Sequence, residues 1–167
     1  MRDEAERLRL GPEPSQKPGE IGTAIINVKC SKGAESVLGK VKEVLTIVLN
    51  QYAVWPSLAE WKRTLPMWFV HACRAEITKE EADREQKQSR SLSPQARARY
   101  ESTIGWSLED WLYWFEPQNR HWFWWNASIE DPTTIRLEIE ISEWPFPWDD
   151  LRWLLRCAGA HDVSLVK

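Results

Sequence analysis

The chain has 167 residues, a length that suits one domain with a single sizeable core. Hydrophobic residues make up 43% and charged residues 28%, a composition that excludes a wholly disordered chain. The net charge of −3 argues against a nucleic-acid-binding protein, because phosphate contacts need an excess of Lys and Arg. No apolar run approaches the roughly 20 residues that cross a bilayer, and the charged start of the chain lacks the apolar stretch of a secretory signal. We therefore expect no membrane association.

The three cysteines are Cys30, Cys73 and Cys157. They are odd in number, lie far apart, and sit in apolar or strand-like surroundings. This pattern is typical of reduced, buried thiols rather than of a disulfide framework. We therefore expect a cytoplasmic protein.

Residues 1–20 are expected to form a flexible N-terminal arm that precedes a single α+β domain at 21–167. Three prolines and two glycines follow Leu10 in the segment GPEPSQKPGE. Such a segment forms neither helix nor strand and is expected to bury no side chain.

The first regular elements are a strand and a helix. Residues 22–30 alternate apolar and polar side chains, which predicts a strand with one buried face. Residues 37–49 carry Val and Leu at helical spacing, with charged residues opposite, which predicts an amphipathic helix.

A helical insertion is predicted at about 55–117. Two capping boxes mark helix starts there, Ser57 with Glu60 and Thr78 with Glu81. Residues 79–90 are polar throughout and predict a solvated helix or a flexible loop. A weak helix follows Ser93-Pro94, and the apolar side of residues 108–115 predicts another helix.

Residues 120–160 predict a hairpin, a proline-rich corner and a helix, and a short closing strand follows them. The hairpin pairs residues 120–129 with residues 134–142, where apolar and polar side chains alternate. In the first of these strands, one side is expected to carry His121, Phe123, Trp125, Ala127 and Ile129. The other side is expected to carry Trp122, Trp124, Asn126 and Ser128.

Without the insertion, the element order is βαββαβ. This order predicts a ferredoxin-like antiparallel sheet with the helical insertion between the first helix and the second strand. Strands 1 and 3 would lie at its centre, with both core helices on one face. The alternation of the strands agrees with this arrangement.

The second face of that sheet is the predicted binding face for a partner or ligand. Aromatic walls with a few polar groups are typical of such sites. The predicted residues are Trp122, Trp124, Asn126, Arg136, Glu138 and Glu140. The alternative is that the tryptophans of the insertion cover this face and build a second core with it.

Catalytic residues are not assigned, and the weak candidates are Glu138 and Glu140. They stand two residues apart on one strand, so their carboxylates could lie about 6–7 Å apart, a spacing found in glycoside hydrolases. The motifs of phosphate-binding loops, dinucleotide sites and serine hydrolases are absent from the sequence. His71 and Cys73 lack a second ligand pair, so neither a metal nor another cofactor is expected.

The sequence favours a small cytosolic, bacterial-type binding or interaction protein, with a protein partner or a small apolar ligand. The first alternative is an enzyme that uses Glu138 or Glu140 as a general base in a tryptophan-lined pocket. The second is single-stranded nucleic-acid binding through Trp122 and Trp124, which the neighbouring carboxylates disfavour. An edge strand beginning at Arg120 could also pair with its twin in a homodimer.

Overall fold

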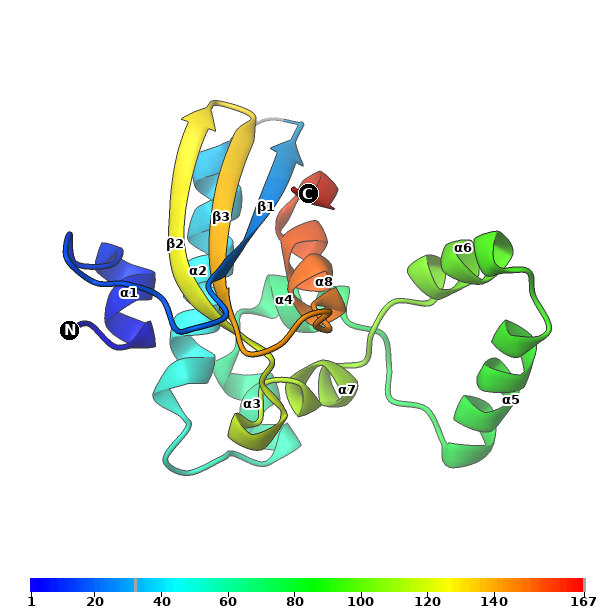
Figure 1. The fold of residues 1–167 in the computed structure, drawn as a ribbon. Coiled ribbons are helices and arrows are strands. Elements are labelled where there is room, and N and C mark those ends of the chain that lie inside the picture. Colours follow the sequence, from blue (N-terminus) through cyan, green and yellow to red (C-terminus); the bar gives the residue numbers. More distant parts are fainter. Residues whose placement is uncertain (32, 167) are drawn as a thin grey trace.

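The computed structural model describes residues 1–31 and 33–166 and has an α+β architecture (Figure 1). Within these residues, four strands form one antiparallel sheet in the order β2-β3-β1-β4. The prediction of an α+β fold with an antiparallel sheet is confirmed. The strands are β1 (Thr23–Cys30), β2 (Trp122–Asp131), β3 (Thr134–Ile141) and β4 (Ala160–Leu165).

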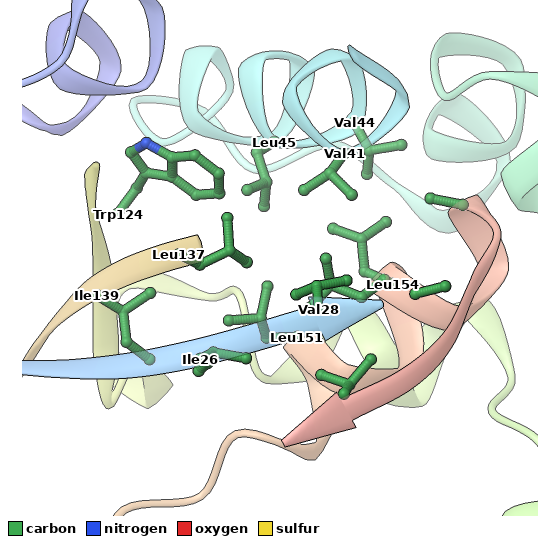
Figure 2. Packing of buried hydrophobic residues seen from close by; sticks show 14 of the residues in the cluster. Ile26, Val28, Val41, Val44, Leu45, Trp124, Leu137, Ile139, Leu151 and Leu154 are labelled. Carbon is green, nitrogen blue, oxygen red and sulfur yellow. The ribbon is translucent and has the colours of Figure 1, made fainter. Parts of the chain in front are cut away.

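Two helices, α2 (Ala34–Asn50) and α8 (Asp149–Ala158), cover one face of the sheet (Figure 1). Strands β1 and β3 bury every second side chain, as their alternation predicted. Figure 2 shows Leu45 of α2 and Leu154 of α8 in the layer that also holds Val28 and Leu137. Each such aliphatic side chain contributes about 1.5–3 kcal/mol by leaving water, so this layer is the centre of the core.

Strand β2 contains a β-bulge at Trp125. Trp124 and Asn126 each pair with a residue of β3, whereas Trp125 between them has no residue opposite. Because side chains alternate between faces, one extra residue inverts the faces of everything before it. Trp122 and Trp124 therefore point into the core, and each is 1% exposed. The prediction that these two tryptophans lie on the free face is wrong.

From Asn126 to Ile129 the strand follows the predicted alternation, although Ile129 is 39% exposed, and a second register shift follows before Asp131. Asn126 pairs with Glu138 on the outer face of the sheet, which we define as the face opposite α2 and α8. Ala127 pairs with Leu137, whose side chain is fully buried in the core. Figure 2 shows Trp124 on the same side of the sheet as Leu137, beneath α2.

Residues 1–20 begin with helix α1 (Glu4–Leu10), which lies beside β2 (Figure 1). The Glu4 carboxylate accepts a 2.6 Å hydrogen bond from the Trp124 N–H, and Arg7 Nε donates to the Trp124 carbonyl at 3.1 Å. Leu8 is 1% exposed. Residues 11–20 bury no side chain, as predicted. The docking of α1 before them was not predicted, because its docking surface lies 117 residues further along the chain.

The same contacts restrict the strand pairing of the predicted homodimer. An edge strand pairs with a twin through its unbonded N–H and C=O groups. At Trp124 both groups are already bonded to α1. A homodimer whose strand pairing runs across Trp124 would therefore have to displace α1.

The predicted insertion is helical, and it joins α2 to β2 (Figure 1). Both predicted capping boxes are present, at Ser57 with Glu60 and at Thr78 with Glu81. The helices are α3 (Leu58–Thr64), α4 (Met67–Ala72), α5 (Lys79–Arg90), α6 (Pro94–Ile104), α7 (Leu108–Tyr113) and the short 3-10 helix η1 (Pro117–Asn119).

A chain of aromatic rings joins the insertion to the core. The ring of Trp111 lies 4.6 Å from that of Phe69 and 4.2 Å from that of Phe115. Phe115 in turn meets Trp122 edge-on at 5.7 Å. Figure 1 shows α3, α4 and α7 at the end of the sheet. The insertion therefore extends the core on the helix side, and Trp111 is not part of a second core over the outer face.

None of the helices in the described residues combines the length and the apolar character that crossing a membrane requires.

Candidate binding groove

A groove of about 770 Å³ separates helices α7 and α8 from the arm, which we define as residues 79–104 with α5 and α6. Figure 1 shows the arm extending away from the sheet and the rest of the helices. A concave surface with aromatic walls and a few polar groups is the usual form of a binding site. The aromatic side chains that line the groove are Tyr100, Trp106, Tyr113, Trp114 and Trp153.

The arm is a helical hairpin, and neither α5 nor α6, both described over their whole length, contains a buried residue. Of the two structures predicted for residues 79–90, the solvated helix is confirmed. Arg97 Nε donates to the Ser89 carbonyl at 2.9 Å, and Ser89 Oγ donates to Glu101 at 2.8 Å, so α6 is tied to the end of α5. Helices of this length are marginal in water without tertiary packing. A partner bound along the inner surface of the arm would therefore stabilise α5 and α6.

The base of the arm is held by Arg74 and Gly105. Arg74 forms a two-pronged ion pair with Glu85, with N–O distances of 2.8 and 2.9 Å. This hydrogen bonding raises the pKa of Arg74 and lowers the pKa of Glu85, so both groups stay charged. Gly105 has a φ of +73°, and a Cβ there would lie 3.0 Å from the Trp153 ring. A glycine is therefore needed where the chain returns from the arm.

The charged lining of the groove is mainly acidic. Arg74 is bound to Glu85, and Arg152 lies 3.0 Å from Asp149, so two of the three arginines are neutralised within the chain. The arm, which the structure describes in full, carries six Lys and Arg residues, and none of them lines the groove. The inner surface of the arm is thus acidic and the outer surface basic. The charged lining residues are Asp83, Glu85, Glu101, Asp110, Asp149, Arg74, Arg152 and Arg156.

The aromatic residues of helix α7 and its C-cap residue Trp114 are divided between the core and the groove. Trp111 is fully buried in the core, whereas Tyr113 is 52% exposed and Trp114 half-buried. The rings of Tyr113 and Trp114 meet edge-on at 5.5 Å. Trp114 belongs to the tryptophans of the insertion, for which packing is the predicted alternative, and no role is predicted for Tyr113. The available signal is that both residues lie off the apolar side formed by Leu108, Trp111, Leu112 and Phe115.

Four of the six predicted binding residues lie on the outer face of the sheet, and Trp122 and Trp124 lie on the other. Arg136 Nε is 3.5 Å from the Glu138 carboxylate. Glu140 accepts a 2.8 Å hydrogen bond from the Gly19 N–H, so the segment before β1 crosses the face there. A binding role for this face stays a prediction. The four residues are Asn126, Arg136, Glu138 and Glu140.

The bulge also separates the weak catalytic candidates from the tryptophans. Glu138 and Glu140 lie on the outer face, whereas Trp122 and Trp124 are enclosed in the core behind it. A tryptophan-lined pocket around these carboxylates is therefore not formed by these two rings, and the rings are not exposed for base stacking. Among the described residues, no group of three or more His, Cys, Asp or Glu side chains is placed to hold a metal ion.

No protein-family model, curated protein or solved structure matches this chain. What it binds must be inferred from its own side chains. The groove combines concavity, half-exposed aromatic rings and a one-sided charge distribution. The outer face of the sheet offers an ion pair and polar side chains around it. The groove is the stronger candidate site.

A second polar cluster, not predicted from the sequence, lies inside the core. Arg120, whose side chain is 1% exposed, binds Glu4 at 2.7 Å and the Trp122 carbonyl at 2.8 Å. It also donates to the hydroxyl of Tyr52. Asp150 accepts a 3.0 Å hydrogen bond from Trp122 Nε1, and burial raises the pKa of Asp150 to about 6. Because these groups are enclosed and bonded to one another, we assign them to stabilising the contacts between α1, β2 and α8.

Proposed function

We propose that this chain is a protein-binding protein that holds a segment of a partner protein in the groove between the arm and helices α7 and α8. The observation that carries the proposal is the arm itself, two helices without buried side chains that stand beside half-exposed aromatic rings. A segment lying in the groove would bury both surfaces at once. Exposed aromatic rings supply much of the binding energy of protein interfaces.

A small apolar ligand is the alternative occupant. The volume of about 770 Å³ falls in the usual range for such ligands, roughly 300–1,000 Å³. The lining, however, includes the carboxylates of Asp83, Glu101 and Asp110. Covering charged groups with an apolar ligand costs free energy unless they find polar partners. A peptide supplies such partners, and a purely apolar molecule does not.

The finer fold assignment is part of the proposal. The order β1-α2-β2-β3-α8-β4, with strand order β2-β3-β1-β4, supports a ferredoxin-like fold with the insertion between α2 and β2. The cysteines Cys30, Cys73 and Cys157 are free, which supports the cytoplasm as the compartment in which the protein works.

The test is a selection of short peptides from an unbiased display library on the immobilised full chain. We expect enriched peptides whose affinity falls roughly tenfold or more in Tyr113→Ala, since truncating an aromatic anchor is among the costliest interface changes. Trp144→Ala is the matched control, because Trp144 is 63% exposed and does not line the groove. The proposal fails when no peptide is enriched, or when both variants bind alike.

A further inference from the structure

We infer that the segment held in the groove is cationic, and that its Lys or Arg side chains lie between the carboxylates of the arm and the aromatic rings of α7. This inference rests on the proposed function and names the class of partner. It combines two independent observations, the distribution of charge around the arm and the exposure of the rings that face it.

The first observation is charge. The arm places Asp83, Glu85 and Glu101 toward the groove. Glu85 is engaged by Arg74, and Glu101 accepts a hydrogen bond from Ser89, whereas Asp83 is exposed. The six Lys and Arg residues of the arm lie outside the lining. Unlike charges across an interface favour association and fix its orientation, so a cationic segment matches this surface.

The second observation is the pair of aromatic rings opposite the arm. Tyr113 is 52% exposed, and Trp114 is half-buried beside it. A guanidinium or ammonium group over such a ring is attracted by its electron-rich face. This chain already forms such contacts elsewhere, with Arg152 at 4.2 Å from the Trp148 ring centre and Arg7 at 4.9 Å from that of Trp125. A Lys or Arg side chain in the groove would therefore meet carboxylates on one side and rings on the other.

Other occupants fit less well. The phosphates of a nucleic acid would meet Asp83, Glu101 and Asp110. A second copy of this chain could offer the basic outer surface of its own arm, and it is the main competitor. A contact between the groove of one copy and the arm of the next closes after two copies only if it is reciprocal, and is otherwise head-to-tail and open-ended. A separate protein with a cationic segment needs neither a reciprocal fit nor an open series.

The experiment measures peptide binding by isothermal titration on the full chain. The probes are two synthetic peptides of equal length and apolar content, one carrying Lys and Arg and the other carrying Glu at the same positions. The acidic variant is Asp83→Asn/Glu101→Gln, which keeps the hydrogen bond from Ser89 available. Glu80→Gln/Glu130→Gln is the control, because it removes two exposed charges that do not line the groove.

We expect the cationic peptide to bind and the acidic peptide not to bind. The cationic peptide should lose roughly fivefold to tenfold in affinity in the groove variant and nothing in the control, and its affinity should fall as salt rises. Equal losses in both variants would mean attraction to net charge alone and would overturn the inference. Neutral or acidic peptides that bind and depend on Tyr113 would also overturn it, while leaving the proposed function intact. If sedimentation shows that the chain self-associates and that the groove variant abolishes this association, the segment in the groove comes from a second copy and not from a separate partner.

Discussion

The guanidinium of Arg74 and the carboxylate of Glu85 face each other in two hydrogen bonds, of 2.8 and 2.9 Å, across the base of the arm. The backbone N–H of Arg74 also donates to the Trp106 carbonyl at 3.0 Å. Arg74 thus binds helix α5 through its side chain and, through its backbone, the segment at Trp106 where the chain leaves the arm. The position of the arm over the groove depends on this residue.

Arg74→Gln should loosen the arm without unfolding the domain. The ion pair is partly exposed, so the free energy of unfolding should fall by about 1 kcal/mol or less. Amide hydrogen exchange across residues 79–104 should accelerate, and groove peptides should bind more weakly. Lys62→Gln, which breaks the 3.1 Å pair with Glu76 outside the groove, is the control. Unchanged exchange in the arm of Arg74→Gln would show that other contacts set its position.

The buried carboxyl of Asp150 should make the domain less stable as pH rises. The folded form, with a pKa of about 6, retains a proton that the unfolded chain releases near its ordinary pKa of 3.8. Stability is therefore lost between about pH 4 and pH 6, by roughly 3 kcal/mol at most. Asp150→Asn should remove this component, measured as the difference in urea unfolding between variant and wild type at several pH values. Asp149→Asn, which changes the exposed carboxylate next to it, is the control variant.

Glu4→Gln should destabilise the domain although Glu4 lies near the start of the chain. The change leaves the guanidinium of Arg120, 1% exposed, without its carboxylate partner. Removing one member of a buried pair costs about 3 kcal/mol or more. Glu6→Gln is the control, since Gln can still accept in the exposed capping box of α1 and only a charge near the helix start is lost, at a cost of about 0.3–1 kcal/mol. Equal losses of stability in urea would argue against the docking of α1.

Trp122→Phe should lower stability without removing any of the tryptophan fluorescence that acrylamide quenches. Trp122 is 1% exposed, and its ring N–H donates to Asp150, so the variant leaves a gap and a carboxyl with one partner fewer. The expected cost is about 2 kcal/mol. Trp144→Phe, at a 63% exposed position, should instead remove a readily quenched component. A loss of quenchable fluorescence in Trp122→Phe would show that this tryptophan is exposed to solvent.

The central strands could be predicted from the sequence because their two faces differ chemically. In β3, isoleucine and leucine alternate with arginine and glutamate, and only one orientation buries the apolar set. The helices α2 and α8 carry equally clear apolar stripes. Residues 122–125, in contrast, are all aromatic, so nothing in them marks the core face. A strict alternation along residues 121–129 groups Trp122 and Trp124 with Asn126, and the bulge at Trp125 breaks that alternation.

The groove could not be predicted because it depends on where the arm points. Residues 79–90 have no apolar stripe, and their sequence contains no information about the surface that they face. The contact that orients them joins Arg74 to Glu85, and such charge pairs are common on solvated helices. Tyr113 and Trp114 equally suit a core or a groove. The docking of α1 escaped prediction for a similar reason, because its partners lie at the other end of the chain.

The bonding of α1 to Trp124 also limits how copies of the sheet can join. The aromatic run at residues 122–125 would otherwise present an apolar strand edge, the usual template for open-ended stacking. With α1 bonded at Trp124, a strand of another copy cannot pair across this aromatic run without displacing the helix. Helix α1 thus shields the most apolar stretch of the β2 edge from strand-by-strand polymerisation.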